Sequence, residues 1–352
     1  MTTDTFVQWM LDSFNRAGFC LMASVGHRCG LFDAMRDLPP VTPAGLAART
    51  GLNERYVREW LGAMTTSRVV EVEPHPEGDR YALPPEHAAV LTREAGADNL
   101  AALTQYIPLL GSVEDDIVEC FKRGGGVPYE RFPRFHAVMA EDSGQSVLSS
   151  LETHVLPLVP DLRASLESGI RLLDVGCGRG LIINRLAELF PKSTFQGMDL
   201  STEAIGYARD HARAKNLTNV SFARADLTDF DRTAEPGAWD AVTTFDAVHD
   251  QAQPLQVLKG IRRTLKPGGV YLMQDIRASS HPAKNVDHPL GTLLYTVSCM
   301  HCMTVSLAQG GEGLGAMWGE EKTREYLQKA GFTSVEVHQL AHDIQNNWYV
   351  VR

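Results

Sequence analysis

The residues best placed for chemistry lie at the ends of short apolar runs in the second half of the chain. The run Arg171–Val175 leads directly into Gly176-Cys177-Gly178-Arg179-Gly180, and an amphipathic helical pattern follows. Glycines at such a strand-to-helix turn let a ligand approach the backbone closely. The next run, Ser193–Met198, ends in Asp199, where a carboxylate can accept hydrogen bonds from both hydroxyls of a ribose. This spacing predicts a site for a ribose-containing ligand.

A second candidate follows the apolar run Asp240–Phe245, where the chain continues as Asp246-Ala247-Val248-His249-Asp250. If this run is the fourth strand of a parallel sheet, its carboxyl end opens on the same ligand crevice. An imidazole with an ordinary pKa of about 6.5 suits removal of a proton from a hydroxyl or thiol at neutral pH. A histidine at a strand end also caps helices or contacts cofactors, and this alternative stays open.

A third candidate is Cys299-Met300-His301-Cys302, inside the uncharged stretch Gly291–Ala308. On a helix Cys299 and Cys302 share a face and could offer two thiolates to a soft ion. Structural zinc needs two more ligands, and the chain has no second C-x-x-C, so we predict no metal site and favour a helix with buried sulfurs. The stretch is long enough to cross a bilayer. Its Ser, Thr and His residues, and its place between elements of one sheet, instead predict a buried helix over the active site, without a membrane partner.

These residues must be positioned by the elements around them. From Ile170 onward short β-rich runs alternate with helical patterns, which is typical of a parallel sheet covered by helices. Earlier in the chain, two helical patterns at Thr42–Arg49 and Glu54–Thr66 precede a hairpin pattern between Val69 and Leu83, and this order predicts a winged helix. We therefore expect three parts in the 352 residues: a winged-helix domain at 1–95, a helical connector at 96–165 and a catalytic domain at 166–352.

Composition and charge indicate which classes of binding partner the protein can have. The net charge is −10, and the predicted wing carries Glu71, Glu73, Glu77 and Asp79, which repel phosphates. Although Arg55 and Arg58 keep DNA binding in view, we expect no nucleic-acid partner and a dimerising or substrate-covering role for this domain. Six scattered cysteines do not form a disulfide framework, which indicates a reducing, cytoplasmic location.

The segment Leu172–Gly180 resembles the first motif of class I S-adenosylmethionine-dependent methyltransferases. Its glycines follow the pattern G-x-G-x-G, and Asp174 stands two residues before the first of them. The strand pattern ending in Asp226-Leu227 and the turn Leu265–Gly269 match later markers of that family. The resemblance implies an α/β fold: a Rossmann-like seven-stranded methyltransferase sheet behind an N-terminal, mostly helical winged-helix domain.

The resemblance implies S-adenosyl-L-methionine as the cofactor. In this family Asp174 would lie near the methionine ammonium, Asp199 would anchor the ribose, and Asp226 with Leu227 would hold the adenine. The expected cofactor-binding residues are Asp174, Gly176, Cys177, Gly178, Asp199, Leu200, Asp226, Leu227 and Phe245.

The whole arrangement is similar to winged-helix small-molecule O-methyltransferases, and to bacterial winged-helix methyltransferases of unsettled substrate. The former place a His-Asp pair at this point as the general base, so His249 and Asp250 are the expected catalytic residues, although Gln251 replaces the tryptophan that often follows. The expected substrate-pocket residues, for each of which plain packing is the alternative, are Tyr129, His136, Tyr295, His301 and Cys302.

We therefore expect a homodimeric methyltransferase that acts on a hydroxyl or thiol of a small molecule. Two alternatives remain at this stage. One is a winged-helix transcription regulator that senses S-adenosylmethionine, and the other is a methyltransferase for a soft metalloid held by Cys299 and Cys302.

Overall fold

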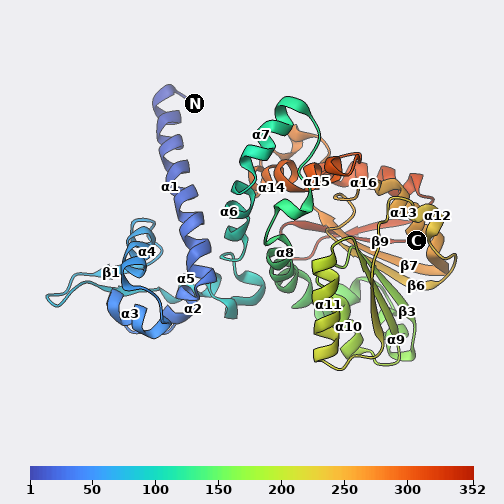
Figure 1. The fold of residues 1–352 in the computed structure, drawn as a ribbon, viewed down its shortest axis with the longest axis horizontal. Helices are drawn as coiled ribbons and strands as arrows, with labels where there is room; N and C mark the ends of the chain where they lie inside the picture. The colour runs from blue at the N-terminus through green and yellow to red at the C-terminus, as the bar shows by residue number, and fades with distance from the viewer. The chain divides into compact units, whose positions relative to one another are not determined.

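The computed structural model describes residues 1–352, and the chain divides into two compact units, Met1–Gly111 and Ser112–Arg352 (Figure 1). The predicted boundaries at residues 95 and 165 stay predictions. The first unit is mostly helical and contains one small two-stranded sheet. Its elements are α1 (Thr3–Arg28), α2 (Leu31–Met35), α3 (Pro43–Thr50), α4 (Glu54–Thr66), β1 (Glu71–Glu73), β2 (Arg80–Ala82), α5 (Pro85–Leu91) and α6 (Tyr106–Gly111).

The winged helix forms where its capping residues predict it. The side chain of Thr42 accepts a hydrogen bond from the amide of Gly45 at 3.2 Å at the start of α3, and Asn53 accepts one from the amide of Arg55 at 3.0 Å at the start of α4; both are N-caps. In the core, the indole of Trp60 donates to the carbonyl oxygen of Met22 at 2.9 Å. The predicted winged helix is therefore present in the structure.

The second unit is built on a seven-stranded sheet with strand order β5-β4-β3-β6-β7-β9-β8. Strands β3 to β7 pair in parallel, and β9 pairs antiparallel with both β7 and β8. The predicted fold class, a mixed α/β protein with a Rossmann-like seven-stranded sheet and a helical winged-helix domain, is confirmed. The strands are β3 (Arg171–Val175), β4 (Thr194–Asp199), β5 (Val220–Arg224), β6 (Trp239–Phe245), β7 (Leu265–Ile276), β8 (Val335–His338) and β9 (Asn346–Val351).

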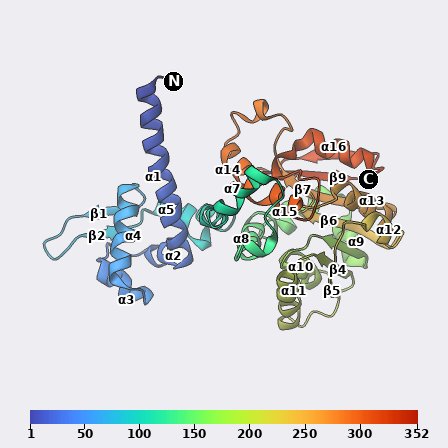
Figure 2. The same cartoon turned by 45° about the horizontal axis from the view of Figure 1, so that its top comes forward.

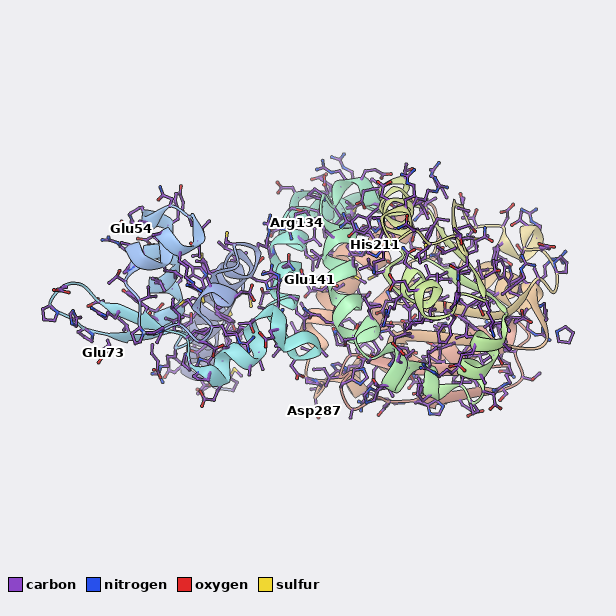
Figure 3. The ribbon with its side chains drawn as sticks, turned by 90° about the horizontal axis from the view of Figure 1, so that it is seen from below. Glu54, Glu73, Arg134, Glu141, His211 and Asp287 are labelled. Atoms are coloured by element: carbon purple, nitrogen blue, oxygen red, sulfur yellow. The ribbon has the colours of Figure 1, made fainter.

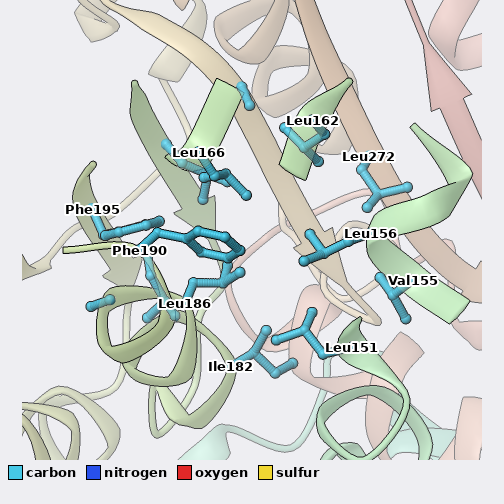
Figure 4. Packing of buried hydrophobic residues seen from close by; sticks show 14 of the residues in the cluster. Leu151, Val155, Leu156, Leu162, Leu166, Ile182, Leu186, Phe190, Phe195 and Leu272 are labelled. Carbon is cyan, nitrogen blue, oxygen red and sulfur yellow. The ribbon is translucent and has the colours of Figure 1, made fainter. Parts of the chain in front are cut away.

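Helices cover both faces of this sheet, with α10 and α11 on one side and α12, α13 and α16 on the other (Figures 1 and 2). Side chains alternate between the faces along each strand: Leu172 packs with α10, whereas Leu173 packs with α13. Figure 4 shows the first of these cores, which also buries Leu151 and Leu156 from the segment before β3. The helices of this unit are α7 (Glu114–Arg123), α8 (Phe135–Ser143), α9 (Leu162–Ser168), α10 (Leu181–Leu189), α11 (Thr202–Ala214), α12 (Phe230–Thr233), α13 (Pro254–Thr264), α14 (Gly291–Val297), α15 (Met303–Ala308) and α16 (Gly319–Lys329).

The uncharged stretch Gly291–Ala308 is not the regular helix that its composition predicts. Helices α14 and α15 are joined by a wider π-helical turn, Ser298–Cys302. By length and composition the stretch is the one helical segment that could cross a membrane, and 44% of it is buried inside the protein. The wider turn contains both His301 and Cys302, which are buried, and π turns of this kind are frequent at functional sites.

Candidate active site

The site lies at the carboxyl ends of the parallel strands, where open α/β sheets bind ligands. The glycine turn after β3 adopts left-handed backbone conformations, with φ of 74° at Gly176 and 52° at Gly178. A Cβ atom on Gly176 would lie 2.4 Å from the Cβ of Ala247, so only glycine fits there. The amides of Gly176 and Cys177 both donate to the carbonyl oxygen of Met198, at 2.8 and 3.0 Å, which fixes the turn against β4.

Asp199, at the end of β4, ties this turn to the next helix. Its Oδ2 accepts from the amide of Gly178 at 2.9 Å, and its Oδ1 accepts from the amide of Ser201 at 2.8 Å. Each carboxylate oxygen has a second lone pair. The side chain is therefore held in one orientation while it can still accept hydrogen bonds from a ligand.

Asp174 is a buried carboxylate on β3 that accepts a hydrogen bond from the hydroxyl of Thr243 at 2.8 Å. Burial raises its pKa to about 7, against the opposing effect of the Thr243 hydrogen bond and with a further contribution from the charge of Asp199. A ligand cation beside Asp174 would favour its ionised form. This behaviour fits the ammonium group that the resemblance implies.

The other predicted cofactor residues lie at or just after the ends of β4, β5 and β6. Asp226 is exposed and its Oδ1 accepts from the amide of Thr228 at 3.0 Å, while Leu227 is buried. The carbonyl oxygen of Leu200 accepts from the guanidinium of Arg224 at 3.1 Å. Phe245 is half-buried against Trp348, with ring centroids 6.1 Å apart.

The acceptor side is centred on His249, which follows β6 and is buried. Its Nδ1 lies 2.7 Å from Oδ1 of Asp275 on β7, so the ring N–H donates to that carboxylate and leaves Nε2 as the reactive nitrogen. The indole N–H of Trp318 donates to the same oxygen at 3.1 Å. Asp275 therefore orients the imidazole, as the third group does in catalytic triads.

Asp250 links this histidine to the segment before the sheet. The hydroxyl of Tyr129 donates to Oδ2 of Asp250 at 3.1 Å, and Oδ1 of Asp250 lies 3.2 Å from Nε2 of His249. Burial, followed by the charges of Asp250 and Asp199, raises the pKa of Tyr129 well above its ordinary value. Tyr129 is therefore a neutral hydrogen-bond donor to Asp250.

The protonation of His249 is set by opposing effects. Burial alone would lower its pKa, but the carboxylates of Asp275 and Asp250 outweigh burial and raise the pKa well above the ordinary value. His301 behaves in the opposite way, because burial and the nearby charges of His136 and His249 lower its pKa well below the ordinary value. His301 is therefore neutral at physiological pH.

Aromatic rings surround His301. It stacks on Phe135 with ring centroids 3.5 Å apart and meets Phe132 edge-on at 4.7 Å. Both of its ring nitrogens are buried without a hydrogen-bond partner, although Nδ1 lies 3.8 Å from Oδ2 of Asp250. Unpaired buried nitrogens in an aromatic pocket are costly to stability, so they point to a role in binding.

The structure brings most of the predicted pocket residues together, but not all of them. Tyr129, His301 and Cys302 lie around His249 and Asp250, and His136 stacks on Tyr129 with ring centroids 6.0 Å apart. Tyr295 instead is 37% exposed and accepts a hydrogen bond from Asn285 at 3.2 Å. Cys299 is half-buried and does not belong to the cluster around His249, whereas Cys302 does. The wider turn Ser298–Cys302 separates the two sulfurs that a regular helix would place on one face.

Sequence reasoning missed Asp275, and the pocket residues it named do not include Trp318, Phe132 or Phe135. A signal for Asp275 was present, because an acidic residue near the end of β7 must lie beside the residues that follow β6 in a parallel pair. Phe132 and Phe135 belong to the aromatic segment 127–136, from which only Tyr129 and His136 were named, and Trp318 could be taken for ordinary core.

Comparison with known proteins identifies both domains. Residues 17–93 match the family model described as Rv2258c-like winged HTH domain, and residues 166–331 match the family model described as methyltransferase domain. The chain therefore joins a winged helix-turn-helix domain to a methyltransferase domain, and the resemblance that the sequence motifs indicated is confirmed.

Relatives and solved structures agree with this assignment. The chain is 32% identical over 108 residues to the ubiquinone biosynthesis O-methyltransferase of Xanthomonas campestris pv. campestris (strain B100), a match that covers 31% of this chain and 44% of that protein. It thus spans less than half the length of that curated relative. Over 100% of its own length it superposes on 99% of human N-acetylserotonin methyltransferase, solved in complex with S-adenosylmethionine, with a TM-score of 0.71 and 18% identity. An O-methyltransferase family protein from Burkholderia thailandensis superposes with a TM-score of 0.70 and 18% identity, over 100% of this chain and 98% of that protein. At this identity the likeness shows the shared fold.

Proposed function

We propose that the protein transfers a methyl group from S-adenosylmethionine to a hydroxyl or thiol of a small molecule. The observation that carries this proposal is the Asp275–His249 hydrogen bond at the carboxyl edge of a methyltransferase sheet. It leaves Nε2 of a buried imidazole beside the strand ends at which the glycine turn and Asp199 also lie. The names of the relatives support oxygen as the accepting atom.

The residues present fit this cofactor. The glycine turn leaves room for close backbone contact, Asp199 keeps free lone pairs for the ribose, and Asp174 offers a buried carboxylate to the ammonium group. When bound, S-adenosylmethionine supplies a methyl group on a positively charged sulfur. The protein contributes by aligning the acceptor with that group, which removes an entropic barrier.

His249 is the proposed general base. In its neutral form Nε2 accepts the proton of the acceptor hydroxyl or thiol, and the carboxylates of Asp275 and Asp250 then stabilise the imidazolium. The same carboxylates raise the pKa of His249, which makes the neutral ring a stronger base. Asp250 is proposed to position rather than to exchange protons, because Tyr129 already donates to it.

The test separates cofactor binding from chemistry. His249→Ala should lower kcat by roughly 10²- to 10⁴-fold while the Kd for S-adenosylmethionine, measured by calorimetry, stays near that of the wild type. Asp199→Ala should instead weaken cofactor binding by about tenfold or more, because it removes a charged acceptor and loosens the glycine turn. Wild-type protein that binds no S-adenosylmethionine, or a His249→Ala variant with unchanged turnover, would contradict the proposal.

A homodimer is proposed through α1. Five of its exposed apolar residues lie close to heptad spacing on one stripe, which is the pattern of a helix seam. Phe14 among them is 63% exposed, whereas the exposed Phe6 and Trp9 lie off this stripe. The members of the stripe are Val7, Leu11, Phe14, Leu21 and Val25. Such a stripe on a 26-residue helix fits a second copy of the same helix. The cytoplasmic location stays a prediction.

The two alternatives receive less support. A metalloid acceptor would need two thiols to hold it, but only Cys302 lies in the cluster around His249. A DNA-binding role for α4 is weakened because Arg55 and Arg58 each pair with a glutamate on the same helix, Glu59 and Glu54. Glu54 and Glu73, labelled in Figure 3, place acidic groups on both α4 and the wing.

A further inference from the structure

Three side chains on the acceptor side form a donor set that goes beyond the proposed proton transfer, because Cys302 takes no part in that step. A ring nitrogen of His249, a carboxylate oxygen of Asp250 and the sulfur of Cys302 all lie within 4.8 Å of one another, and all three residues are buried. Nitrogen, oxygen and sulfur donors in one cluster suit Zn²⁺ and related ions. The carboxylate and a thiolate would together balance the charge of a divalent cation.

The surroundings of these donors resemble those of bound metal ligands. Nδ1 of His249 is hydrogen-bonded to Asp275, and Trp318 fixes that carboxylate; a carboxylate behind the imidazole is the usual outer partner of a metal-binding histidine. Tyr129 donates to Oδ2 of Asp250, while Oδ1 is buried without a hydrogen-bond partner. The imidazole and the carboxylate are thus each oriented by an outer partner.

We propose that His249 Nε2, Asp250 Oδ1 and Cys302 Sγ bind one Zn²⁺ ion, with a fourth position left open. Cys302 binds as the thiolate, so its S–H proton is released to solvent when the Zn–S bond forms. The C-x-x-C motif contributes one ligand to this site, Cys302, and the loop after β6 supplies the other two, His249 and Asp250. Cys299 takes no part.

The bound ion would inhibit methyl transfer. Nε2 of His249 cannot coordinate zinc and accept a proton at the same time, so micromolar Zn²⁺ should reduce turnover reversibly. This consequence rests on the proposed function, whereas the binding itself does not. The two are therefore tested by different measurements.

Binding is tested on the full-length protein after chelator treatment, with Co²⁺ as the spectroscopic probe. Titration should give one equivalent of Co²⁺ bound and an intense thiolate-to-cobalt charge-transfer band, which Zn²⁺ then abolishes by displacement. Cys302→Ser should remove that band and weaken Zn²⁺ binding at least tenfold. The matched control Cys299→Ser should retain both the band and the affinity.

A second variant, Asp250→Asn, keeps the test valid if Cys302→Ser does not fold. Asp250→Asn, with folding of each variant checked by circular dichroism, should weaken Zn²⁺ binding by about 10-fold or more. Absence of the charge-transfer band in the wild type, its survival in Cys302→Ser, or its loss in Cys299→Ser would each overturn the proposed site. If Zn²⁺ binds without inhibiting methyl transfer, the proposed metal site is supported and the role of His249 as the base is contradicted.

Discussion

The imidazole of His249 lies between two carboxylates that come from neighbouring strand ends. Asp275 binds Nδ1 at 2.7 Å and Asp250 approaches Nε2 at 3.2 Å, and Cys302 is the third group that acts on the ring. The base works only when the ring is neutral. Because the carboxylates raise its pKa, activity is expected to be lost as the pH falls through that raised value.

Replacing the orienting carboxylate tests this reasoning. In Asp275→Asn one of the charges that raise the pKa of His249 is gone, so the acidic limb of kcat/KM against pH should move to lower pH. The plateau should also fall, since an amide orients the ring less well. A full pH profile checks both effects, and an acidic limb at an unchanged pH would show that another group controls it.

The candidate site shows which residues a sequence can reveal. Asp174, Asp199 and His249 stand next to strand patterns, and strand ends in a parallel sheet share one edge, so their proximity could be predicted. Cys302 and His301 lie some 50 positions later in the chain than His249, and only the wider turn at Ser298–Cys302 directs them to it. A turn of that kind has no residue signature, so the position of Cys302 beside His249 and Asp250 could not be derived from residue spacing alone.

At the scale of elements, the segment before α8 is clamped to α15. The amide of Val127 donates to the hydroxyl of Thr304 at 2.7 Å in a buried position. A Cβ on Gly126 would lie 2.0 Å from the carbonyl oxygen of Thr304, so the two backbones touch. This contact holds the segment that carries Tyr129 beside the helix that follows His301 and Cys302.

Thr304→Val should therefore lower the free energy of unfolding by about 1–3 kcal/mol, because it leaves the buried amide of Val127 without a partner. Thr304→Ser keeps the hydroxyl and should cost less. Urea denaturation of the two variants checks the difference. Equal stabilities would mean that the hydrogen bond contributes little.

The fold itself was the more predictable part. Helices α3 and α4 begin at capping residues that the sequence displays, Thr42 and Asn53, and the alternation of strands and helices after Ile170 predicts a parallel sheet. The seven strands of the sheet also follow from the family resemblance. The irregular segment 144–158, which holds two further π turns and a short 3₁₀ turn, lies outside such rules because tertiary packing of Leu151 and Leu156 decides its shape.

At the scale of the whole molecule, the apolar stripe on α1 predicts association. Phe14→Asp places a charge in the middle of that stripe and should shift the protein from dimer to monomer. Asn15→Asp adds the same charge beside the stripe and serves as the control. Light scattering coupled to size-exclusion chromatography measures the mass of each, and a wild-type protein that runs as a monomer would contradict the proposed seam.

The winged helix is expected not to bind DNA. Its two α4 arginines are paired within the helix, and its wing is acidic. Fluorescence anisotropy with a labelled duplex should show no binding at about 50 mM salt, where non-specific electrostatic binding is strong. Saturable binding of the duplex under these conditions would support the alternative that the protein is a transcription regulator.

Different stretches of chain build the two sides of the proposed site. The groups assigned to the cofactor come from strand ends of the sheet, whereas the rings around His301 come from residues 127–136 and His301 itself from residues 298–302. Point changes in those two short stretches would remodel one side and leave the other intact. Descendants of this protein could therefore diverge in the compounds they accept while inheriting the same methyl donor.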